Sequence, residues 1–257
     1  MFSFKKIKGD HLFRDVNDEI RNEVVKTIIK ASTPRKSFFV MVAVSSFLCT
    51  AGLLMESVTL IIGSMLIAPM LSAILSISLG MVVLNIKLFY RSVLVVSKAF
   101  LLLFISAFGI SMFFDMSQEF SYDFLLKSEL QLEIFIVALI VGFAATLSFV
   151  RKELSQYVIG TAIAVTLIPP IAISAIALRM GYPDYFLNAL WIFFINFMGI
   201  IISSVAVFVV TKFHYAQKKV IEELEDEKKF LDKLTRKEKI RKWLFEGFSL
   251  AKNVFKR

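Results

Sequence analysis

The sequence is poor in the residues that build redox, metal and catalytic sites: it holds one cysteine and two histidines in 257 residues. Cys49 has no second cysteine to pair with, so no disulfide within the chain holds the fold together. His11 and His214 lie in polar stretches and no HExxH pattern occurs, which excludes a zinc peptidase of that type and a Ser/His dyad inside a membrane. We expect the protein not to be an enzyme and to need no metal or cofactor.

Charge is scarce in the long apolar stretches that make up most of the chain. We expect no Asp, Glu, His, Lys or Arg near the middle of any of them. Membrane pumps relay protons through such groups, so their absence argues against a proton relay. The start of the chain, 1–36, is polar and charged and lacks the apolar core of a cleavable signal peptide, so we expect no processing.

What the chain does have is apolar sequence in long blocks. Hydrophobic residues make up 57% of it, and the mean hydropathy is +0.73, more apolar surface than a soluble domain of this length can bury. Each block is close to the ~20 residues that a helix needs to cross ~30 Å of hydrocarbon. The sequence therefore predicts an all-α polytopic membrane protein with about six transmembrane helices. Their expected ranges are 37–54, 57–80, 92–114, 133–150, 156–178 and 187–211.

The distribution of positive charge predicts the orientation. The net charge is +9, and the basic residues cluster at the two ends and in short loops. Short loops rich in Lys and Arg stay in the cytoplasm, and six crossings would put all of these clusters on one side and the acidic loop 115–132 on the other. If the two proline-containing segments were re-entrant hairpins instead, Lys87 and Arg91 would face outside, so charge favours six crossings with both termini cytoplasmic. This explanation leaves no reason to expect a nucleic-acid partner.

Amphipathic cytoplasmic helices are expected at both ends, within 1–36 and 212–257. In 11–30, apolar residues recur at helical spacing opposite a charged face. The stretch from 212 onward is predicted to form a charged helix with a partial heptad repeat, so a coiled coil is one alternative for it. The heptad positions are Val220, Leu224, Leu231 and Leu234. Residues 240–255 place basic side chains around one apolar face, which fits either a helix bound to membrane lipid of the inner leaflet or a helix packed on protein.

Two apolar segments carry proline near their middle, at Pro69 and at Pro169 and Pro170. Proline inside a helix removes a backbone donor and collides with the carbonyl four residues earlier, at a cost of ~3 kcal/mol or more. In lipid each freed carbonyl needs a partner, and the hydroxyls of nearby Ser and Thr residues can provide one. Pro170 could also start a half-helix whose positive amino end points at the membrane centre. One such proline is commonly a kink that shapes a bundle, whereas two at matching places point to a site.

The six segments divide into two halves, 37–114 and 133–211. Each half has three segments, and in each half the prolines lie in the middle one, which is the second or the fifth segment of the chain. Because three is odd, two halves with the same internal fold must be inserted upside down relative to each other. Such inverted repeats occur in many secondary transporters, which bind their substrate at the midplane between discontinuous helices. The sequence therefore predicts two inverted three-helix repeats.

We predict a substrate-binding or ion-binding site where the two broken helices meet near the midplane. Its prolines break the helices, and its Ser, Thr and Asn side chains supply polar contacts. The residues are Ser64, Pro69, Ser72, Thr166, Pro169, Pro170, Ser174 and Asn196. Asn196 has a simpler alternative, a hydrogen bond to a neighbouring helix worth ~0.6 kcal/mol. Glu56 and Glu133 are expected at the outer edge, as a headgroup-level carboxylate or at a helix start.

These stretches resemble a known family, the bacterial and archaeal "domain of unknown function 389" membrane proteins. The residues similar to its first signature lie around Pro69 and after it; they are Glu56–Ser57, Ile62–Met70, Gly80, Leu88 and Arg91. Those similar to its second signature are Gly142–Ala145, Gly160–Val165, Leu167–Pro170 and Phe194–Asn196. The resemblance covers roughly residues 40–212. It implies an integral protein of a prokaryotic cytoplasmic (inner) membrane whose activity is not established.

The sequence leads to two functional hypotheses. The first is an integral membrane transporter or channel for an unidentified small solute or ion, acting as a homo-oligomer. The alternative is a membrane scaffold or regulatory protein that does not transport and acts through its cytoplasmic helices. Removing the carboxyl-terminal helix would separate the two, because a transporter should keep its flux and a scaffold should lose its partner.

Overall fold

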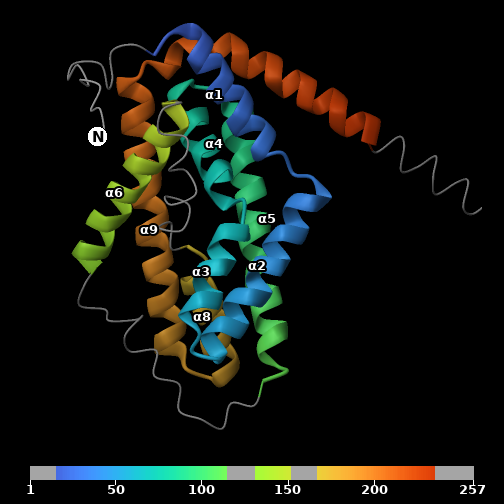
Figure 1. Cartoon of the computed structure of the whole chain (residues 1–257), viewed down its shortest axis with the longest axis vertical. Coiled ribbons are helices and arrows are strands. Elements are labelled where there is room, and N and C mark those ends of the chain that lie inside the picture. The colour runs from blue at the N-terminus through green and yellow to red at the C-terminus, as the bar shows by residue number, and fades with distance from the viewer. Residues whose placement is uncertain (1–15, 115–130, 152–166, 235–257) are drawn as a thin grey trace, which may run out of the picture.

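The arrangement of the helices is seen in a computed structural model of the chain, which describes residues 16–114, 131–151 and 167–234. All regular secondary structure in these residues is helical (Figure 1). The elements are α1 (Asp18–Ala31), α2 (Lys36–Leu54), α3 (Val58–Ile67), α4 (Met70–Val82), α5 (Ile86–Ser111), α6 (Gln131–Val150), α8 (Ile168–Met180), α9 (Pro183–Val210) and η3 (Phe213–Ala216). A further helix, called the arm, covers residues 217–234. The predictions for Thr166, for most of the acidic loop and for 235–257 fall outside the described residues.

Four helices are long and apolar enough to cross a membrane, namely α2, α5, α6 and α9. α3 and α4 pass the same test as a pair, with a bend of 49° between them. The residues that the structure describes therefore include four or five helices capable of spanning a membrane, as a polytopic membrane protein requires. α8 is apolar but shorter, with 13 residues, and it follows a stretch outside the described part of the chain.

Two of the long helices begin earlier than the apolar pattern predicts. α5 starts at Ile86 and not near 92, because the Asn85 side chain caps its first turn with a hydrogen bond of 2.9 Å. α9 starts at Pro183 and not near 187, because proline fits the first turn of a helix, where its missing N–H is not needed. Hydropathy marks the apolar part of a helix, whereas the caps decide where the helix begins.

The earlier start of α5 changes the position of Lys98. In a helix of 26 residues from Ile86 to Ser111, Lys98 stands in the middle, and its side chain is exposed on the outside of the bundle. The expectation that no charged residue lies near the middle of an apolar segment is therefore wrong for this helix. It failed because it assumed a later start, which placed Lys98 close to the end of the segment.

The two ends of the elongated bundle differ (Figure 1). α1, η3, the arm and the α4–α5 turn lie at one end, called the α1 end, and the α2–α3 and α8–α9 turns lie at the opposite end. α1 buries Val24, Val25, Ile28 and Ile29, and it packs against α4 and η3. Val220 of the arm is fully buried, so this part of the heptad faces the protein itself and not a coiled-coil partner.

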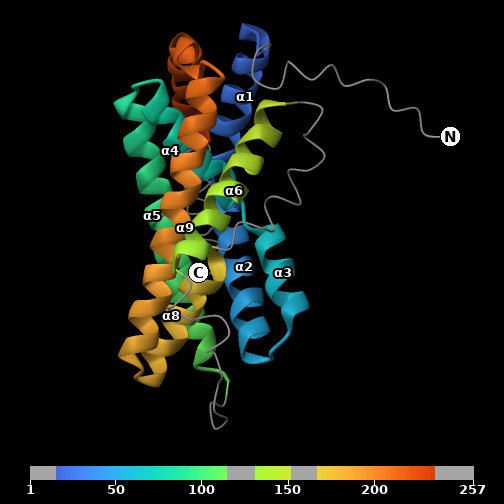
Figure 2. The same ribbon diagram turned by 90° about the vertical axis from the view of Figure 1, so that its left-hand side faces the viewer.

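α4 and α8 form the centre of the bundle. Every residue from Met70 to Gly80 and from Ile168 to Ala177 is buried. α4 packs against α5 and α9, and α8 packs against the same two long helices. α5 and α9 thus hold both short helices, while α2, α3 and α6 complete the bundle around them (Figures 1 and 2). Helices that are apolar and buried on all sides belong to the core of such a bundle.

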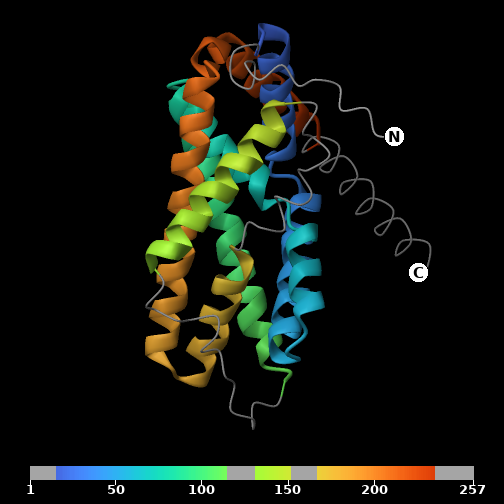
Figure 3. The same ribbon diagram turned by 60° about the vertical axis from the view of Figure 1, so that its left-hand side comes forward.

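α6 and α9 cross closely because each brings a glycine to the contact (Figure 3). A Cβ on Gly142 would lie 2.7 Å from the Cα of Ile200, and a Cβ on Gly199 would lie 2.7 Å from the Cβ of Ala138. Small residues let helix backbones approach each other in a membrane, where packing and not the hydrophobic effect drives association. The glycines therefore position α6 against the part of α9 that runs from its middle towards the α1 end.

The outer surface of the long helices is apolar. Exposed side chains of this kind lie on α2, α5, α6 and α9. They include Met41, Phe47, Leu101, Ile105, Ile136, Ile140, Trp191 and Ile202. Exposed apolar surface of this extent fits contact with lipid or with another protein and not with water.

Candidate functional site

Each of the two central helices starts abruptly inside the bundle. α4 begins after Ala68, whose backbone is extended, and Pro69. α8 begins after Leu167, with Pro169 and Pro170 in its first turn. No side chain caps either start by a hydrogen bond. The helix break expected at Pro69 is present, and the two prolines of the second segment stand where a helix begins, a position that proline favours.

The starts of α4 and α8 lie at about half the height of the bundle, and the two helices run from there to opposite ends (Figures 1 and 3). A short turn joins the carboxyl end of α4 to α5, and another joins that of α8 to α9. Each short helix is about half as long as the long helix that follows it, and all helices rise equally per residue. The start of each short helix therefore lies beside the middle of that long helix. This register puts Ala99 level with the start of α4 and Asn196 level with the start of α8, and both side chains are buried.

Three phenylalanines join α5 and α9 at the same height. Phe100 makes edge contacts with Phe193 (4.5 Å between ring centroids) and with Phe197 (5.8 Å), and the latter two rings are stacked at 5.7 Å. Aromatic pairs of this kind are worth about 0.5–1.5 kcal/mol beyond the burial of their area. Sequence reasoning missed this cluster, because the chain has 27 phenylalanines and no spacing marks these three.

Ser72 in the first turn of α4 and Ser174 farther along α8 each bond to a backbone carbonyl of their own turn. Ser72 donates to the carbonyl of Pro69 (3.3 Å), and Ser174 donates to that of Ile171 (2.7 Å). The carbonyl that a proline leaves without a donor stands four residues before it, so these two bonds do not bear out the expectation that nearby hydroxyls satisfy the freed carbonyls. The hydroxyl hydrogens are in use, while each oxygen keeps lone pairs that can accept a hydrogen bond.

Five of the predicted residues lie at about the height of the two helix starts. Pro69 and Ser72 lie at the start of α4, while Pro169 and Pro170 lie at the start of α8, level with Asn196. The polar groups at this height include the backbone N–H groups of the first turns, one hydroxyl oxygen and one side-chain amide. Such a set can hold a small solute by hydrogen bonds.

Two predicted residues lie away from the helix starts, and one lies outside the described part of the chain. Ser64 faces α2, because its carbonyl accepts a hydrogen bond from Ser45 (2.7 Å), and its hydroxyl donates to the carbonyl of Ile61 (2.6 Å). Ser174 stands about two turns along α8 from its start. Thr166 is the residue outside the described ranges. A binding role for any of the predicted residues stays a prediction.

Hydroxyl groups also join neighbouring helices of the bundle. Ser76 of α4 and Ser92 of α5 share a hydrogen bond of 2.8 Å, and Thr146 of α6 donates to Ser204 of α9 at the same distance. Ser46 of α2 donates to a backbone carbonyl of α5 (2.8 Å). A buried polar group needs such a partner, so these residues are accounted for by packing. Among the residues that the structure describes, no three His, Cys, Asp or Glu side chains come together as a metal site.

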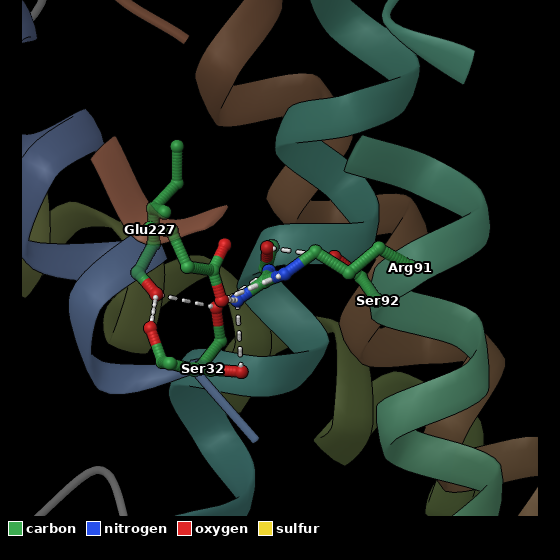
Figure 4. Close-up of polar contacts among 7 residues, drawn as sticks. Ser32, Arg91, Ser92 and Glu227 are labelled. Carbon is green, nitrogen blue, oxygen red and sulfur yellow. Dashed lines mark hydrogen bonds and ion pairs between the residues drawn. The ribbon is translucent and has the colours of Figure 1, made fainter. Parts of the chain in front are cut away.

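A second polar cluster ties the α1 end together (Figure 4). Arg91 of α5 forms a salt bridge with Glu227 of the arm, with 3.1 Å between Arg91 Nε and Glu227 Oε1. The same guanidinium donates to the hydroxyl (3.4 Å) and to the carbonyl (3.3 Å) of Ser32, at the end of α1. The side chains of Arg91 and Glu227 are 18% and 7% exposed. A guanidinium has several N–H donors in a fixed planar arrangement, so Arg91 of α5 can hold both the arm and the end of α1.

The arm lies across the α1 end and forms one wall of a groove. The Arg35 guanidinium lies over the ring of Phe230 of the arm, 4.5 Å from its centroid, which is a cation–π contact. A groove of about 570 Å³ lies between the arm and the α4–α5 turn, with Lys87 and Leu224 in its walls. The sequence marks Arg91 as an interface residue but cannot pair it with a glutamate 136 positions away.

Long apolar helices packed around the two buried helices α4 and α8 are typical of a polytopic membrane protein. Comparison with known proteins gives the family. Residues 65–202, more than half of the chain, match the family described as "Domain of unknown function (DUF389)". The chain belongs to this family, as its similarity to the two family signatures indicated. The matched range includes Pro69, Pro169, Pro170 and Asn196.

One curated relative is similar to a large part of the chain. The "Uncharacterized protein MJ0678" of Methanocaldococcus jannaschii is 28% identical over 191 residues, which are 74% of this chain and 58% of the relative. The chain therefore spans less than two thirds of that relative's length. No solved structure matches the chain.

Proposed function

We propose that the protein is an integral membrane transporter or channel for a small solute or ion, with its site between the amino ends of α4 and α8. One observation carries this proposal: two buried helices of 13 residues each begin inside the bundle and run to opposite ends. Secondary transporters bind their substrates at helix breaks of this kind, because the free backbone groups there can contact a solute. A bundle that needed only kinked helices has no reason to bury two helix starts at one height.

Two inverted three-helix repeats account for this arrangement in our proposal, with six membrane crossings. α2, α3–α4 and α5 form the first repeat, and α6, the span that ends in α8, and α9 form the second. Paired lengths support it: 19 and 20 residues in the first helices, 13 in each half-helix, and 26 and 28 in the third helices. Phe100 and Phe197, which contact each other, hold matching positions in the third helices.

The start of α4 offers more backbone donors to a solute than the start of α8. A helix start carries about half a positive charge and up to four free N–H groups. In α8, Pro169 and Pro170 remove two of these donors. In α4 the proline, Pro69, stands at the cap position, so the N–H groups of the first turn are kept. We therefore expect small anions and dipolar solutes to bind in preference to cations.

The described arrangement is closed around the proposed site. Met70 and Ile168, the first residues of the two half-helices, are buried, so a solute reaches these starts only when a helix moves. α3 is the element we expect to move. It buries only Ser64 and Met65, and a bend of 49° separates it from α4.

We place the α1 end in the cytoplasm of a prokaryotic cell and the spans in its inner membrane, with both termini cytoplasmic. Basic residues at the ends of long helices support this orientation, because Lys87, Arg91, Arg151 and Lys212 all lie towards the α1 end. Basic segments next to membrane spans stay in the cytoplasm. The first turn of α9, at the opposite end, carries the acidic Asp184.

Flux into proteoliposomes tests the transport proposal. The purified full-length chain should carry at least one small anion or neutral dipolar solute faster than empty liposomes do. Asn196→Leu should reduce that flux about tenfold, which corresponds to ~1.4 kcal/mol of lost interaction. A folded wild-type protein that carries none of the screened solutes would refute the proposal.

Two serines provide a matched control for position. Ser72 and Ser111 each donate to the carbonyl three residues earlier, and both are buried, but Ser111 lies at the end of α5 far from the helix starts. Ser72→Ala should lower the flux, and Ser111→Ala should leave it unchanged. Equal effects of the two substitutions would show that the loss reflects general packing and not the site.

The α1 end favours a second function, a scaffold or regulatory protein that does not transport and acts through α1 and the arm. The arm is held by Arg91 and yet leaves apolar side chains on the surface, with Ile221 47% and Phe230 39% exposed. If this function is correct, removing residues 217–257, which include the arm, should abolish capture of a partner from membranes. A chain that carries solute with and without these residues, and captures no partner, is a transporter.

A further inference from the structure

Two charged side chains stand exposed on the apolar outer surface of the bundle. Lys98 lies at the middle of α5, and Glu133 lies in the first turn of α6. Apart from Ser97, the exposed neighbours of both residues along their helices are apolar; they are Leu94, Leu101 and Ile105 on α5, and Leu132, Ile136 and Val137 on α6. A charge in such surroundings needs a partner, because contact with hydrocarbon is unfavourable for it.

The contact between α5 and α9 gives the height of Lys98. Phe100 packs against Phe193 and Phe197, which lie near the middle of α9. Lys98 stands two residues from Phe100, so it is level with the middle of α9 as well. It is also about 18 Å along α5 from Ile86, farther than a lysine side chain extends, so it does not reach the helix end.

The contact between α6 and α9 gives the height of Glu133. Ala138 lies against Gly199, and the two helices run in the same direction, so Glu133 lies about 7 Å before that contact and level with the middle of α9. Figure 3 shows the same start of α6 part of the way along α9. Glu133 does begin a helix, as expected, but this start is not at the edge of the bundle, because α6 is shorter than α9 and lies against its second half.

Lys98 and Glu133 thus share one height but lie on different faces of the bundle. α9 contacts both α5 and α6 and lies between them (Figure 1). Within the described residues, no salt bridge joins either charge to another group. One chain therefore presents a cation on one apolar face and an anion, at the same depth, on another.

We propose that a second copy of this chain docks on the α5 face through its α6 face, so that Lys98 pairs with Glu133 of the partner subunit. The pair neutralises both charges, and the apolar neighbours on the two helices pack around it. Contact between two α5 faces would bring lysines together, and contact between two α6 faces would bring glutamates together. The interface is therefore heterologous, so each subunit can bind one neighbour through its α5 face and another through its α6 face. This inference does not depend on what the protein carries.

Cysteine cross-linking tests the contact directly. A full-length chain carrying Lys98→Cys, produced together with a differently tagged chain carrying Glu133→Cys, should give a cross-linked heterodimer in membranes treated with a short bismaleimide. The native Cys49 is buried and stays in both chains, so the untreated background is measured with the wild-type chain. Each variant produced alone should cross-link no more than wild type. Efficient cross-linking of Lys98→Cys to itself, or none between the two variants, would overturn the proposal.

Charge reversal gives a second measurement. In nanodiscs, native mass spectrometry should show that Lys98→Glu and Glu133→Lys each lower the subunit number and that the double variant restores it. Lys87→Glu, an exposed lysine in the first turn of the same helix, is the matched control and should leave the number unchanged. If a reversal prevents folding, Lys98→Gln and Glu133→Gln replace it with the same expected loss. A monomeric wild type, or single variants with the wild-type subunit number, would refute the interface.

Discussion

Gly199 of α9 lies against Ala138 of α6, with 2.7 Å between the Cβ of Ala138 and the place that a Cβ on Gly199 would occupy. No side chain fits there without a shift of the backbone, because the Cβ of Ala138 is fixed to its own helix. The two helices are as close as this contact allows, and the depth of α6 within the bundle follows from it. The position of Glu133 in our oligomer proposal rests on the same contact.

Gly199→Val should therefore destabilise the fold by about 1–3 kcal/mol, the usual cost of overpacking. Thermal unfolding in detergent should show this as a lower Tm. Gly109→Ala is the control, because nothing lies within 4 Å of a Cβ at that helical position, and it should be neutral or stabilising by up to ~1 kcal/mol. A Gly199→Val protein as stable as wild type would mean that α6 and α9 do not cross as described.

Glu227→Gln should loosen the arm by weakening its salt bridge with Arg91. The pair is largely buried, at 7% and 18% side-chain exposure, so we expect a loss of about 1–3 kcal/mol, between the values for exposed and fully buried pairs. Hydrogen exchange should become faster in the arm and stay the same in α9.

The matched control for the arm is Asp226→Asn. Asp226 pairs with Lys229 on the exposed side of the same helix, at 63% and 72% side-chain exposure, and such pairs contribute little. Exchange in the arm should then match wild type. Equal acceleration by both substitutions would show that helix content, and not the contact with Arg91, holds the arm in place.

Pro69→Ala should let α3 and α4 join into a straighter helix, because alanine restores the missing N–H and removes the clash of the proline ring. The start of α4 would then have intrahelical partners and no free donors for a solute. We expect the solute flux to fall about tenfold, equivalent to ~1.4 kcal/mol, with little change in Tm. Pro34→Ala, in the connection between α1 and α2, is the control, and unchanged flux in Pro69→Ala would place the site elsewhere.

The pKa of Lys219 in the arm is raised above its ordinary value of 10.5, first by its hydrogen bonds to Glu222 and Glu223. Because the folded pKa lies above the unfolded one, the contribution of Lys219 to the stability of the arm is complete below about pH 10 and is lost as the pH rises through the folded pKa. Carbon NMR of labelled lysines should show late deprotonation of Lys219. The double variant Glu222→Gln, Glu223→Gln should move its titration to lower pH; an unmoved titration would contradict this cause.

Much of the candidate site could be predicted because proline chemistry is local. Pro69 breaks a helix wherever it stands, because its ring removes a backbone donor and collides with the preceding turn. The depth of Asn196 follows from counting residues along an apolar segment. Whether these groups meet depends on how α4 and α8 pack between α5 and α9, and the two segments are about a hundred positions apart in the chain.

The features that could not be predicted all depend on contacts between distant segments. Arg91 and Glu227 are 136 positions apart, and only the packing of the arm against α5 brings them together. Lys98 stands at the middle of α5 because the helix starts at the Asn85 cap, whereas hydropathy predicts a start near 92. Phe100 is one of many phenylalanines until α9 brings two more beside it.

The sequence by itself determined the class of the protein, the apolar nature of its helices and the place of the break at Pro69. These follow from hydropathy and from the covalent structure of proline, which act within a single segment. Only the tertiary structure decided that α4 and α8 are the buried centre, that their starts share one height, and that Lys98 and Glu133 stand level on opposite sides of α9. The physical reason is that helix packing depends on side-chain shape at contacts such as Gly199 with Ala138, and no local property of the chain encodes which surfaces will meet.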